Sequence, residues 1–145
     1  KKVHNLAIGE KTAEELKIKV GAAVPMNEEI TMAVKGRDLM SGLPRTVELA
    51  TNELVQAMTK ELREMTQAIR KVLQETPPEL AADIIDNGII LTGGSSQLRQ
   101  MPELVFRRTG VIAKLGQDPY FCVARGTGIA LKHLHTYQKS ILAKQ

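Results

Sequence analysis

The sequence predicts an α/β protein made of two blocks, because the pattern of apolar residues changes near Gly88. Residues 12–76 have the pattern of a helix, a β-hairpin and a long helix, which together form an α+β unit. Residues 86–133 have the pattern of a strand, a tight turn, a helix, a second strand and a helix, which form an α/β unit. We therefore expect two domains, one over residues 1–86 and one over residues 87–145.

The composition is that of an ordinary globular protein with few aromatic residues. Of the 145 residues, 43% are hydrophobic and 25% are charged, which is a usual balance. Only 3% are aromatic and none is tryptophan, so the core must be aliphatic. The net charge of +4 permits binding to nucleic acid or anionic lipid without requiring it. The single cysteine, Cys122, excludes an internal disulfide and suits a reducing cytoplasm.

We identify neither a membrane-spanning segment nor a signal peptide, since no apolar run approaches the ~20 residues that a spanning helix needs. The first residue is Lys1 rather than methionine, and the opening residues resemble the middle of an element. We therefore expect the sequence to be a piece of a longer polypeptide.

In the first block, a helix is predicted to begin near Thr12. Thr12 and Glu15 have the spacing of a capping box, in which each side chain bonds a backbone N–H of the first turn. The apolar stripe of this helix ends at Val20. Apolar and polar residues then alternate over residues 30–35 and again over residues 47–49, which predicts a β-hairpin with a long polar loop.

The longest helix is predicted to begin at Thr51 and to stop before Pro77 and Pro78. Pro78 can also open a short helix over residues 79–85, since its missing N–H costs nothing in a first turn. Apolar residues of the long helix recur at three- and four-residue steps, which predicts one buried face. They are Leu54, Met58, Leu62, Met65, Ile69 and Val72.

In the second block, the unbroken apolar run over residues 89–91 predicts a strand buried on both faces of a parallel or mixed sheet. After a tight turn, a helix is predicted from Gln97 to Arg108. A second strand is predicted over residues 111–115, and Asp118-Pro119 is the expected start of a helix that runs to His133. The remainder is basic and either helical or frayed.

The turn after the first of these strands, Thr92-Gly93-Gly94-Ser95-Ser96, is the sharpest local feature. A strand that passes through glycines into a helix leaves N–H groups free at the helix start, where negative or electron-rich ligands are favoured. Glycine also lets a ligand approach the backbone closely. The motif is neither a phosphate-binding P-loop nor a dinucleotide fingerprint. On the residues alone, a ligand-binding loop and a merely structural turn both stay open.

Glu14 and Lys17 are a second candidate, because residues three apart project from the same side of a helix. Such a pair could hydrogen-bond ribose hydroxyls or flank an adenine ring. It could equally be a solvated ion pair, which is the more ordinary case.

The remaining cysteine, glycine and histidine residues of note are not predicted to form a functional site. Cys122 lies on a predicted packing helix and is interpreted as a structural thiol. Gly126 and Gly128 within that helix are expected to permit close approach of a neighbouring element. No metal site is expected, because the histidines lack partners at metal-ligand spacing; they are His4, His133 and His135.

Several segments, taken in order, resemble the MreB/Mbl family of bacterial actin homologues and cover nearly the whole chain. The run from Thr76 to Asp86 is highly specific. The matching segments are residues 8–21, Lys35-Gly36-Arg37-Asp38-Leu39, residues 41–46, Glu75-Thr76-Pro77-Pro78-Glu79-Leu80-Ala81-Ala82-Asp83-Ile84-Ile85-Asp86, Thr92-Gly93-Gly94, Asp118-Pro119, Cys122-Val123-Ala124 and Gly126-Thr127-Gly128.

The resemblance implies the C-terminal half of an actin-like fold, of the actin and heat-shock chaperone ATPase superfamily. Residues 1–86 would be an α+β hairpin subdomain, the small upper one, and residues 87–145 part of the lower α/β subdomain. It also implies an ATP or ADP site, of which this chain holds the adenosine side. The implied nucleotide-binding residues are Glu14, Glu15, Leu16, Lys17, Gly93, Gly94, Ser95, Ser96 and Gln97.

In this family the phosphate loops and the residues that activate water would lie upstream of Lys1. No catalytic residue and no metal ligand is therefore expected here, and Mg²⁺ only together with the missing N-terminal half. The chain alone is not expected to hydrolyse ATP. Two positions depart from the family pattern: Ser95 stands where a third glycine is usual, and Arg125 where a small or apolar residue is common.

The resemblance further implies a cytoplasmic protein that self-associates into membrane-associated filaments. Its partners would be the cell-wall elongation machinery and the inner face of the membrane, with no nucleic acid. Two alternatives stay open: a chaperone-type ATPase lobe of the same superfamily, and a basic nucleic-acid-binding module that rests on charge alone.

Overall fold

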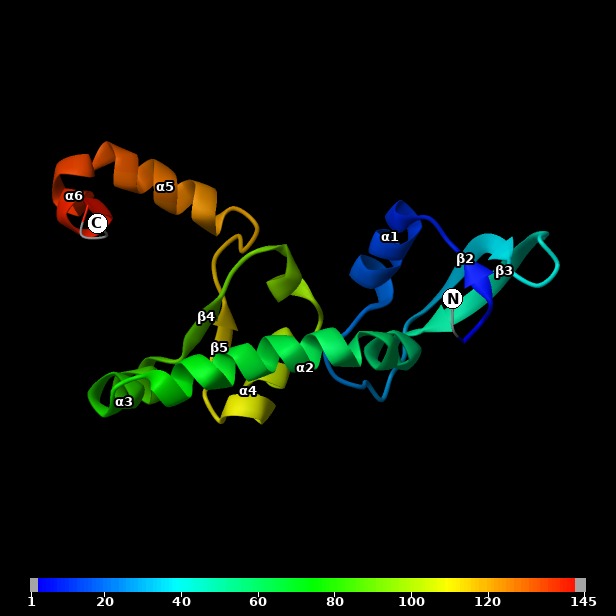
Figure 1. Ribbon diagram of the computed structural model, residues 1–145, viewed down its shortest axis with the longest axis horizontal. Coiled ribbons are helices and arrows are strands. Elements are labelled where there is room, and N and C mark those ends of the chain that lie inside the picture. Colours follow the sequence, from blue (N-terminus) through cyan, green and yellow to red (C-terminus); the bar gives the residue numbers. More distant parts are fainter. Residues whose placement is uncertain (1–2, 143–145) are drawn as a thin grey trace.

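The computed structural model describes residues 3–142, and their side chains up to residue 138. The long helix α2 runs along the longest axis of the molecule, with the β2–β3 hairpin near one end and α3 near the other (Figure 1). The elements are, in order, β1 (Leu6–Ala7), α1 (Glu10–Val20), β2 (Thr31–Asp38), β3 (Pro44–Ala50), α2 (Thr51–Glu75), α3 (Pro78–Asn87), β4 (Ile89–Leu91), the 3₁₀ helix η1 (Gly94–Gln97), α4 (Met101–Thr109), β5 (Ala113–Leu115), α5 (Cys122–Lys132) and α6 (Leu134–Leu142).

The first sheet is antiparallel, in the order β1-β2-β3. Val34 lies opposite Val47, and Arg37 lies opposite Pro44 at the far end of the hairpin. Pairing therefore continues to Asp38 and Pro44, and the expected long loop is wrong: residues 39–43 alone connect the strands. The strands extend because β1 pairs with the end of β2, where Leu6 lies opposite Asp38.

Two hydrophobic clusters form the core, and α2 passes through both. Met58 packs against each of them. The first cluster joins α1, the sheet and the start of α2 through Leu6, Leu16, Val20, Val34 and Leu54. The second joins the segment after α1 to α2 and α4 through Ala23, Val24, Leu62, Met101 and Leu104.

The structure confirms that the long helix begins at Thr51, but its predicted buried face is only partly correct. Leu54 and Leu62 are buried, whereas Met65 and Val72 are exposed in the second half of the helix. Near its middle the buried position is Thr66, whose hydroxyl donates to the Leu62 carbonyl oxygen at 3.0 Å. The sequence pattern marks an apolar stripe, and α4 covers only part of it.

The capping box predicted at Thr12 and Glu15 is wrong. Helix α1 begins at Glu10, and Gly9 is its N-cap without a side-chain hydrogen bond. The first helical bond runs from the Ala13 N–H to the Gly9 carbonyl oxygen, at 3.0 Å. Because Glu10 and Lys11 are both good helix formers, the helix extends one turn further than the cap signal indicated.

The second sheet is a parallel pair, with Ile89 opposite Ala113 and Leu91 opposite Leu115. The expectation that β4 is buried on both faces is wrong, since the Ile90 side chain is 70% exposed. In the described part of the chain, β4 has β5 as its only strand neighbour. A wholly apolar strand therefore presents one uncovered face.

The predicted helix over residues 97–108 begins later than expected. After η1, the chain is extended at Leu98 and left-handed at Gln100, with φ of 59°, before α4 begins at Met101. Gly110 ends α4 in the left-handed region, as its place in the sequence predicts.

The helix predicted from Asp118 is also shorter than expected. Asp118 has a φ of 48°, which makes it part of a turn rather than an N-cap, and α5 begins at Cys122. Helices α5 and α6 extend away from the rest of the molecule (Figure 1). No atom in the described part of the chain lies within 4 Å of a Cβ built on Gly126 or Gly128, so the close approach expected there is absent. Among residues 3–142, no helix is both long and apolar enough to cross a membrane.

Candidate functional site

Helix α1 has an outer stripe that does not take part in the core. Leu16 and Val20 are buried against the sheet, so they define the inner face of the helix. Glu14 and Lys17 are exposed, and the Ile18 side chain is 66% exposed. Residues four apart share one side of a helix, so Glu14 and Ile18 form a stripe opposite the core with Lys17 at its edge.

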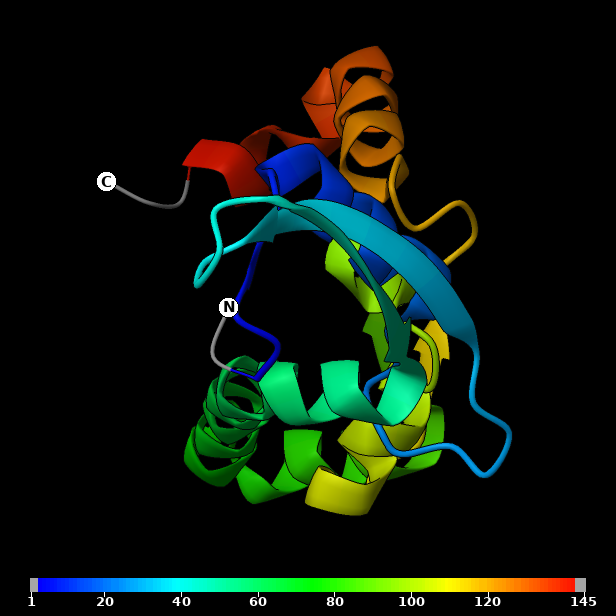
Figure 2. The ribbon, with the colours of Figure 1, turned by 90° about the vertical axis from the view of Figure 1, so that its right-hand side faces the viewer.

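This stripe points away from the first sheet. In Figure 1 the strands β2 and β3 lie to the right of α1, and in Figure 2, viewed from that side, the sheet lies in front of the helix. The glycine loop and the start of α5 lie on the opposite side of α1 from the sheet (Figure 1). The outer stripe of α1 therefore faces the part of the molecule that carries the second sheet.

Backbone and side-chain hydrogen bonds join the end of α1 to the segment that follows η1. The Ala23 N–H donates to the Arg99 carbonyl oxygen at 2.7 Å, and Ala22 and Arg99 form a parallel bridge. The Arg99 Nη1 donates in turn to the Lys19 carbonyl oxygen at 3.0 Å. Glu14 lies five residues before Lys19, about 7.5 Å further along the helix. These bonds close the base of the space between α1 and the glycine loop.

The glycine loop keeps its backbone open. Gly93 has a φ of 86°, and a Cβ built on it meets no atom within 4 Å. Its N–H donates to the Pro119 carbonyl oxygen at 2.7 Å, while its carbonyl oxygen accepts from the Ser96 hydroxyl at 2.7 Å. The loop is thus held from both sides and still leaves room for a ligand above Gly93.

The predicted site residues are not all equally available. Leu16 belongs to the core and Ser96 is buried with its hydroxyl already bonded, so these two could offer a ligand little more than backbone atoms. Glu14, Lys17 and Ser95 are exposed. The short η1 helix follows the glycines in place of the α-helix start that the sequence predicts.

An aromatic pair at the rim of the loop escaped the sequence analysis. Tyr120 and Phe121 are largely exposed, with ring centroids 5.2 Å apart in an edge-to-face arrangement. A Cβ built on Gly94 would lie 3.5 Å from the Tyr120 ring, which places that ring against the loop. The signal was present in the sequence, since an aromatic pair in an aromatic-poor chain is unusual.

Arg125, one of the two departures noted in the sequence, has a structural role. Its Nη1 lies 2.7 Å from the Asp118 Oδ2, and its N–H donates to the Phe121 carbonyl oxygen at 2.9 Å. Both side chains are exposed, so the pair adds little to overall stability. It joins α5 to the turn over residues 118–121 that carries the aromatic pair.

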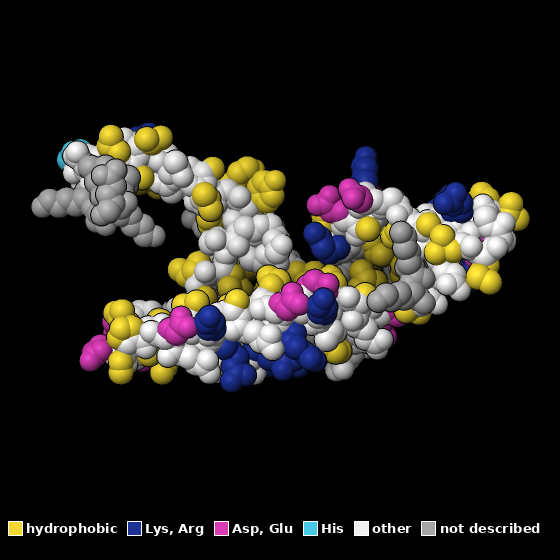
Figure 3. Space-filling model, in the orientation of Figure 1, with side chains coloured by type: hydrophobic (Ala, Val, Ile, Leu, Met, Phe, Trp, Pro, Cys, Tyr) yellow, Lys and Arg dark blue, Asp and Glu magenta, His cyan; other side chains and the backbone are white. Residues whose placement is uncertain are grey.

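The space-filling view shows an open notch between the lobe that carries α1 and the lobe that carries the second sheet (Figure 3). Acidic and basic side chains gather on the α1 side of this notch, and hydrophobic side chains on the other side. A charged wall, an apolar wall and a glycine-lined backbone suit a ligand with a flat apolar part and polar hydroxyls. The notch is the candidate site.

Two carboxylates with perturbed pKa values lie elsewhere. A hydrogen bond from His4, whose Nε2 lies 2.5 Å from the Glu53 Oε2, holds the pKa of Glu53 below its usual value. Hydrogen bonds to its carboxylate hold the pKa of Asp38 far below its usual value. The bond from the Ser41 N–H has the largest effect, followed by those from the Arg45 side chain and the Met40 N–H. Both groups order the hairpin lobe, so neither marks the notch.

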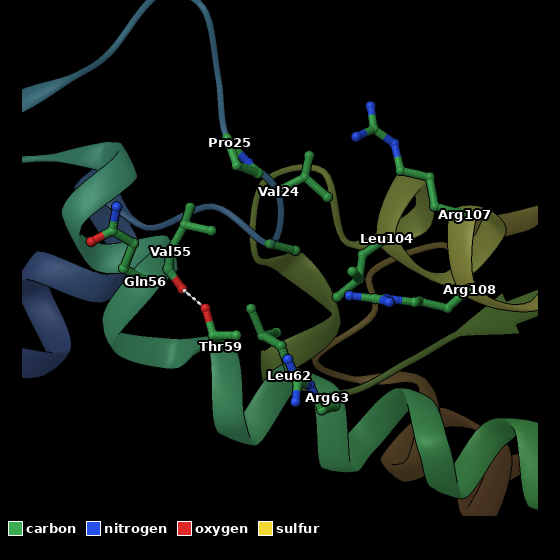
Figure 4. Close-up of a pocket in the computed structure, with 11 residues that line it drawn as sticks. Val24, Pro25, Val55, Gln56, Thr59, Leu62, Arg63, Leu104, Arg107 and Arg108 are labelled. Carbon is green, nitrogen blue, oxygen red and sulfur yellow. Dashed lines mark hydrogen bonds between the residues drawn. The ribbon is translucent and has the colours of Figure 1, made fainter.

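A separate pocket of about 430 Å³ lies between α2, α4 and the segment after α1 (Figure 4). None of the predicted site residues lines it. Leu62, Leu104 and Arg108 line it together with Arg107, whose Nε donates to the Glu103 Oε1 at 2.7 Å. The notch is the better candidate, because it combines open glycine backbone with a charged helix face.

The fold and the notch define the class of the protein: the structure is part of an actin-like α/β fold. Crystal structures of MreB5 of Spiroplasma citri, bound to ADP and to AMPPNP, superpose on it with TM-scores of 0.86 and 0.87, at 35% and 33% sequence identity. In both cases the likeness covers 97% of this chain and 42% of the other.

The chain belongs to the MreB/Mbl family. The family model described as MreB/Mbl protein matches residues 1–139. The cell shape-determining protein Mbl of Bacillus cereus is 40% identical over 142 residues, which cover 98% of this chain and 43% of that protein. The cell shape-determining protein MreB of Escherichia coli K12 is 38% identical over 138 residues, covering 95% and 40%. The chain thus spans about two fifths of the length of these relatives, and the family membership displaces the chaperone-type alternative.

Proposed function

We propose that this chain provides the adenosine side of an ATP or ADP site in a bacterial actin homologue. The observation that carries the proposal is the notch, in which the outer stripe of α1 and the open glycine loop face each other above a hydrogen-bonded base. Support comes from the MreB5 relatives, whose crystal structures were determined with ADP and AMPPNP bound.

Each wall of the notch has a distinct role in this proposal. Glu14 accepts hydrogen bonds from the ribose hydroxyls, and Lys17 donates to the sugar or to the base edge. On the other wall, the backbone of Gly93 approaches the nucleotide closely, because no side chain lies against it. Gly94 borders the nucleotide beside the Tyr120 ring. Ser95 and Gln97 border the loop, and Glu15, Leu16 and Ser96 take part through neighbouring backbone atoms.

The phosphates and Mg²⁺ are assigned to a part of the polypeptide outside this chain. Among residues 3–142, no group of three or more His, Cys, Asp or Glu side chains is placed to hold a metal ion. We therefore expect this chain to bind nucleotide weakly and not to hydrolyse it. The proposed division at residues 1–86 and 87–145 places one wall of the notch in each domain.

We also propose that the complete protein self-associates into filaments at the cytoplasmic face of the membrane and there organises cell-wall synthesis with the elongation machinery. The proposal rests on the family, whose members Mbl and MreB are cell shape-determining proteins. Nucleotide binding in the notch would then govern assembly. No role for nucleic acid is proposed.

The test is a titration of the ¹⁵N-labelled chain with ADP and ATP up to millimolar concentration, followed through backbone amide shifts. We expect the largest shifts at residues 14–17 and 93–97. Glu14→Ala should weaken binding by about tenfold, which corresponds to one lost hydrogen bond to a charged group. Glu79→Ala is the matched control, because Glu79 is an exposed glutamate on α3, at the far end of α2.

A folded chain without amide shifts at either wall would contradict an adenosine site that acts alone. Ser95→Gly would then be measured, since it restores the family's third glycine. If amide shifts appear only in this variant, the serine side chain is what prevents nucleotide binding in the original chain. Shifts centred on the pocket near Leu104 would contradict the notch and move the site to that pocket.

A further inference from the structure

The exposed aromatic pair at residues 120 and 121 has the character of a binding surface. The chain has only two tyrosines and two phenylalanines, yet two of these four rings stand side by side in solvent. The Tyr120 side chain is 69% exposed and that of Phe121 58%. Leaving two large rings in water forgoes much of the free energy that their burial would release. Exposed apolar groups at the rim of a cleft mark surfaces that bind something.

The turn that carries Tyr120 is held rigidly. The Phe121 N–H donates to the Asp118 carbonyl oxygen at 2.9 Å, and Pro119 accepts from the Gly93 N–H at 2.7 Å. The ion pair between Asp118 and Arg125 fixes the turn to α5 from the other side. The position of the Tyr120 ring is therefore preorganised, which lowers the entropy lost when a ligand contacts it.

The ring also lies where a ligand of the notch would meet it. A Cβ built on Gly94 would lie 3.5 Å from Cδ2 and 3.6 Å from Cε2 of Tyr120, so the ring packs over a residue without a side chain. Phe121 meets it edge-on, with an interplanar angle of 78°. Across the notch, the exposed Ile18 belongs to the outer stripe of α1.

We propose that Tyr120 contacts the base of the bound nucleotide and stacks on it. This inference rests on the proposed nucleotide site and assigns its base-contacting side chain. The bound group is a flat aromatic heterocycle, because stacking requires a planar face and tolerates different bases. Ile18 supplies an apolar surface on the opposite wall.

The test uses the only two tyrosines of a chain that lacks tryptophan. In the Tyr137→Phe variant, Tyr120 is the sole source of tyrosine fluorescence. We expect ADP to quench this emission with the same midpoint as the amide shifts of Gly93 and Gly94. Ribose 5-phosphate, which lacks the base, should produce no quenching. Tyr120→Ala should weaken ADP binding by about tenfold, and Tyr120→Phe should retain it, since stacking needs the ring and not the hydroxyl.

The outcomes separate this inference from the function on which it rests. Amide shifts at residues 14–17 and 93–97 without quenching, and with unchanged affinity in Tyr120→Ala, would overturn the role of Tyr120 and leave the site intact. Absence of both shifts and quenching in the folded chain would overturn the site and the inference together. Equal loss of binding in Tyr120→Ala and Tyr120→Phe would overturn stacking, because only the hydroxyl distinguishes tyrosine from phenylalanine.

Discussion

Asp38 orders the tip of the hairpin through a set of hydrogen bonds to one carboxylate. Its Oδ1 accepts from the N–H groups of Met40 and Ser41, each at 2.9 Å, and its Oδ2 pairs with Arg45 at 2.9 Å. These bonds favour the charged form and hold the pKa of Asp38 far below its usual value. The carboxylate therefore stabilises the folded loop at every pH above the ordinary aspartate value of about 4. This stability is lost as the pH falls below that value toward the folded pKa.

The first prediction concerns Asp38→Asn, which removes the charge and keeps the shape. We expect the variant to unfold several degrees below the wild-type chain at pH 7, because the ion pair with Arg45 and the charge-assisted bonds are weakened. The difference should narrow as the pH is lowered from 7 to about 2.5. Thermal unfolding followed by circular dichroism measures both effects. Glu48→Gln is the control, since Glu48 is an exposed carboxylate on β3; an equal loss there would remove the special role of Asp38.

At the scale of residues, the sequence indicates part of the candidate site through Glu14, Lys17 and the glycine pair. Leu16 is implied by the family resemblance alone, and its side chain belongs to the core. Tyr120 was missed. Its place beside the glycine loop depends on the hydrogen bond between Gly93 and Pro119. That bond joins residues 26 positions apart, so no local sequence pattern contains it.

Helix α2 is the element that makes the two lobes one molecule. Leu54 belongs to the cluster at the first sheet, Leu62 to the cluster at α4, and Met58 packs against both. A helix is stiff over this distance, so the two clusters have a fixed relation along it. The geometry of the notch therefore depends on α2, although the helix contributes none of the candidate site residues.

The second prediction concerns Leu62→Ala, which removes a buried side chain from the cluster at α4. We expect a loss of about 2–4 kcal/mol in the free energy of unfolding, as is usual for a leucine cavity. Urea denaturation measures it. Val72→Ala on the same helix is the matched control, because the Val72 side chain is 65% exposed and its truncation should change the stability by less than about 0.5 kcal/mol.

The same variant tests whether α2 couples the two clusters. If it does, amide signals of the hairpin and of α4 should lose their native positions at the same urea concentration. Loss of the α4 signals first, with the hairpin intact, would show that the lobes unfold independently and that α2 does not transmit stability between them.

The sequence predicts elements better than it predicts their ends. Thr51 and Pro78 mark helix starts correctly, because the change of periodicity and the proline act locally. Asp118 and Gln97 do not, because the backbone is left-handed at Asp118 and at Gln100. The residues beside these two, Pro119 and Arg99, accept hydrogen bonds from Gly93 and Ala23, which lie far away in the sequence. The exposed face of β4 could not be predicted either, since an apolar strand has the same pattern whether or not its neighbours are present.

On the scale of the whole molecule, the surface is unevenly apolar. No residue of α5 is buried, while Val123, Ile129 and Leu131 are exposed on it, and Ile90 is exposed on β4. Exposed apolar side chains such as these are typical of a surface that packs against a neighbour. The chain spans about two fifths of its relatives' length.

Gly126 and Gly128 allow a test of whether α5 packs against a neighbour, because the described part of this chain contains no contact that requires them. Both lie within α5, and a Cβ on either meets no atom within 4 Å. Glycine inside a helix is less favourable than alanine by roughly 0.5–1 kcal/mol. Gly126→Ala should therefore stabilise α5 by about this amount in the 145-residue chain. Slower hydrogen exchange of the α5 amides measures it, and Ala124→Gly, as the reverse change on the same helix, should accelerate exchange by a similar factor.

A destabilising effect of Gly126→Ala would show that α5 is already packed in solution, against a second copy of the chain or against its own sheet. Sedimentation at two protein concentrations separates these cases, because only contact with a second copy depends on concentration. A stabilising effect would show that the glycines serve no contact within this lobe.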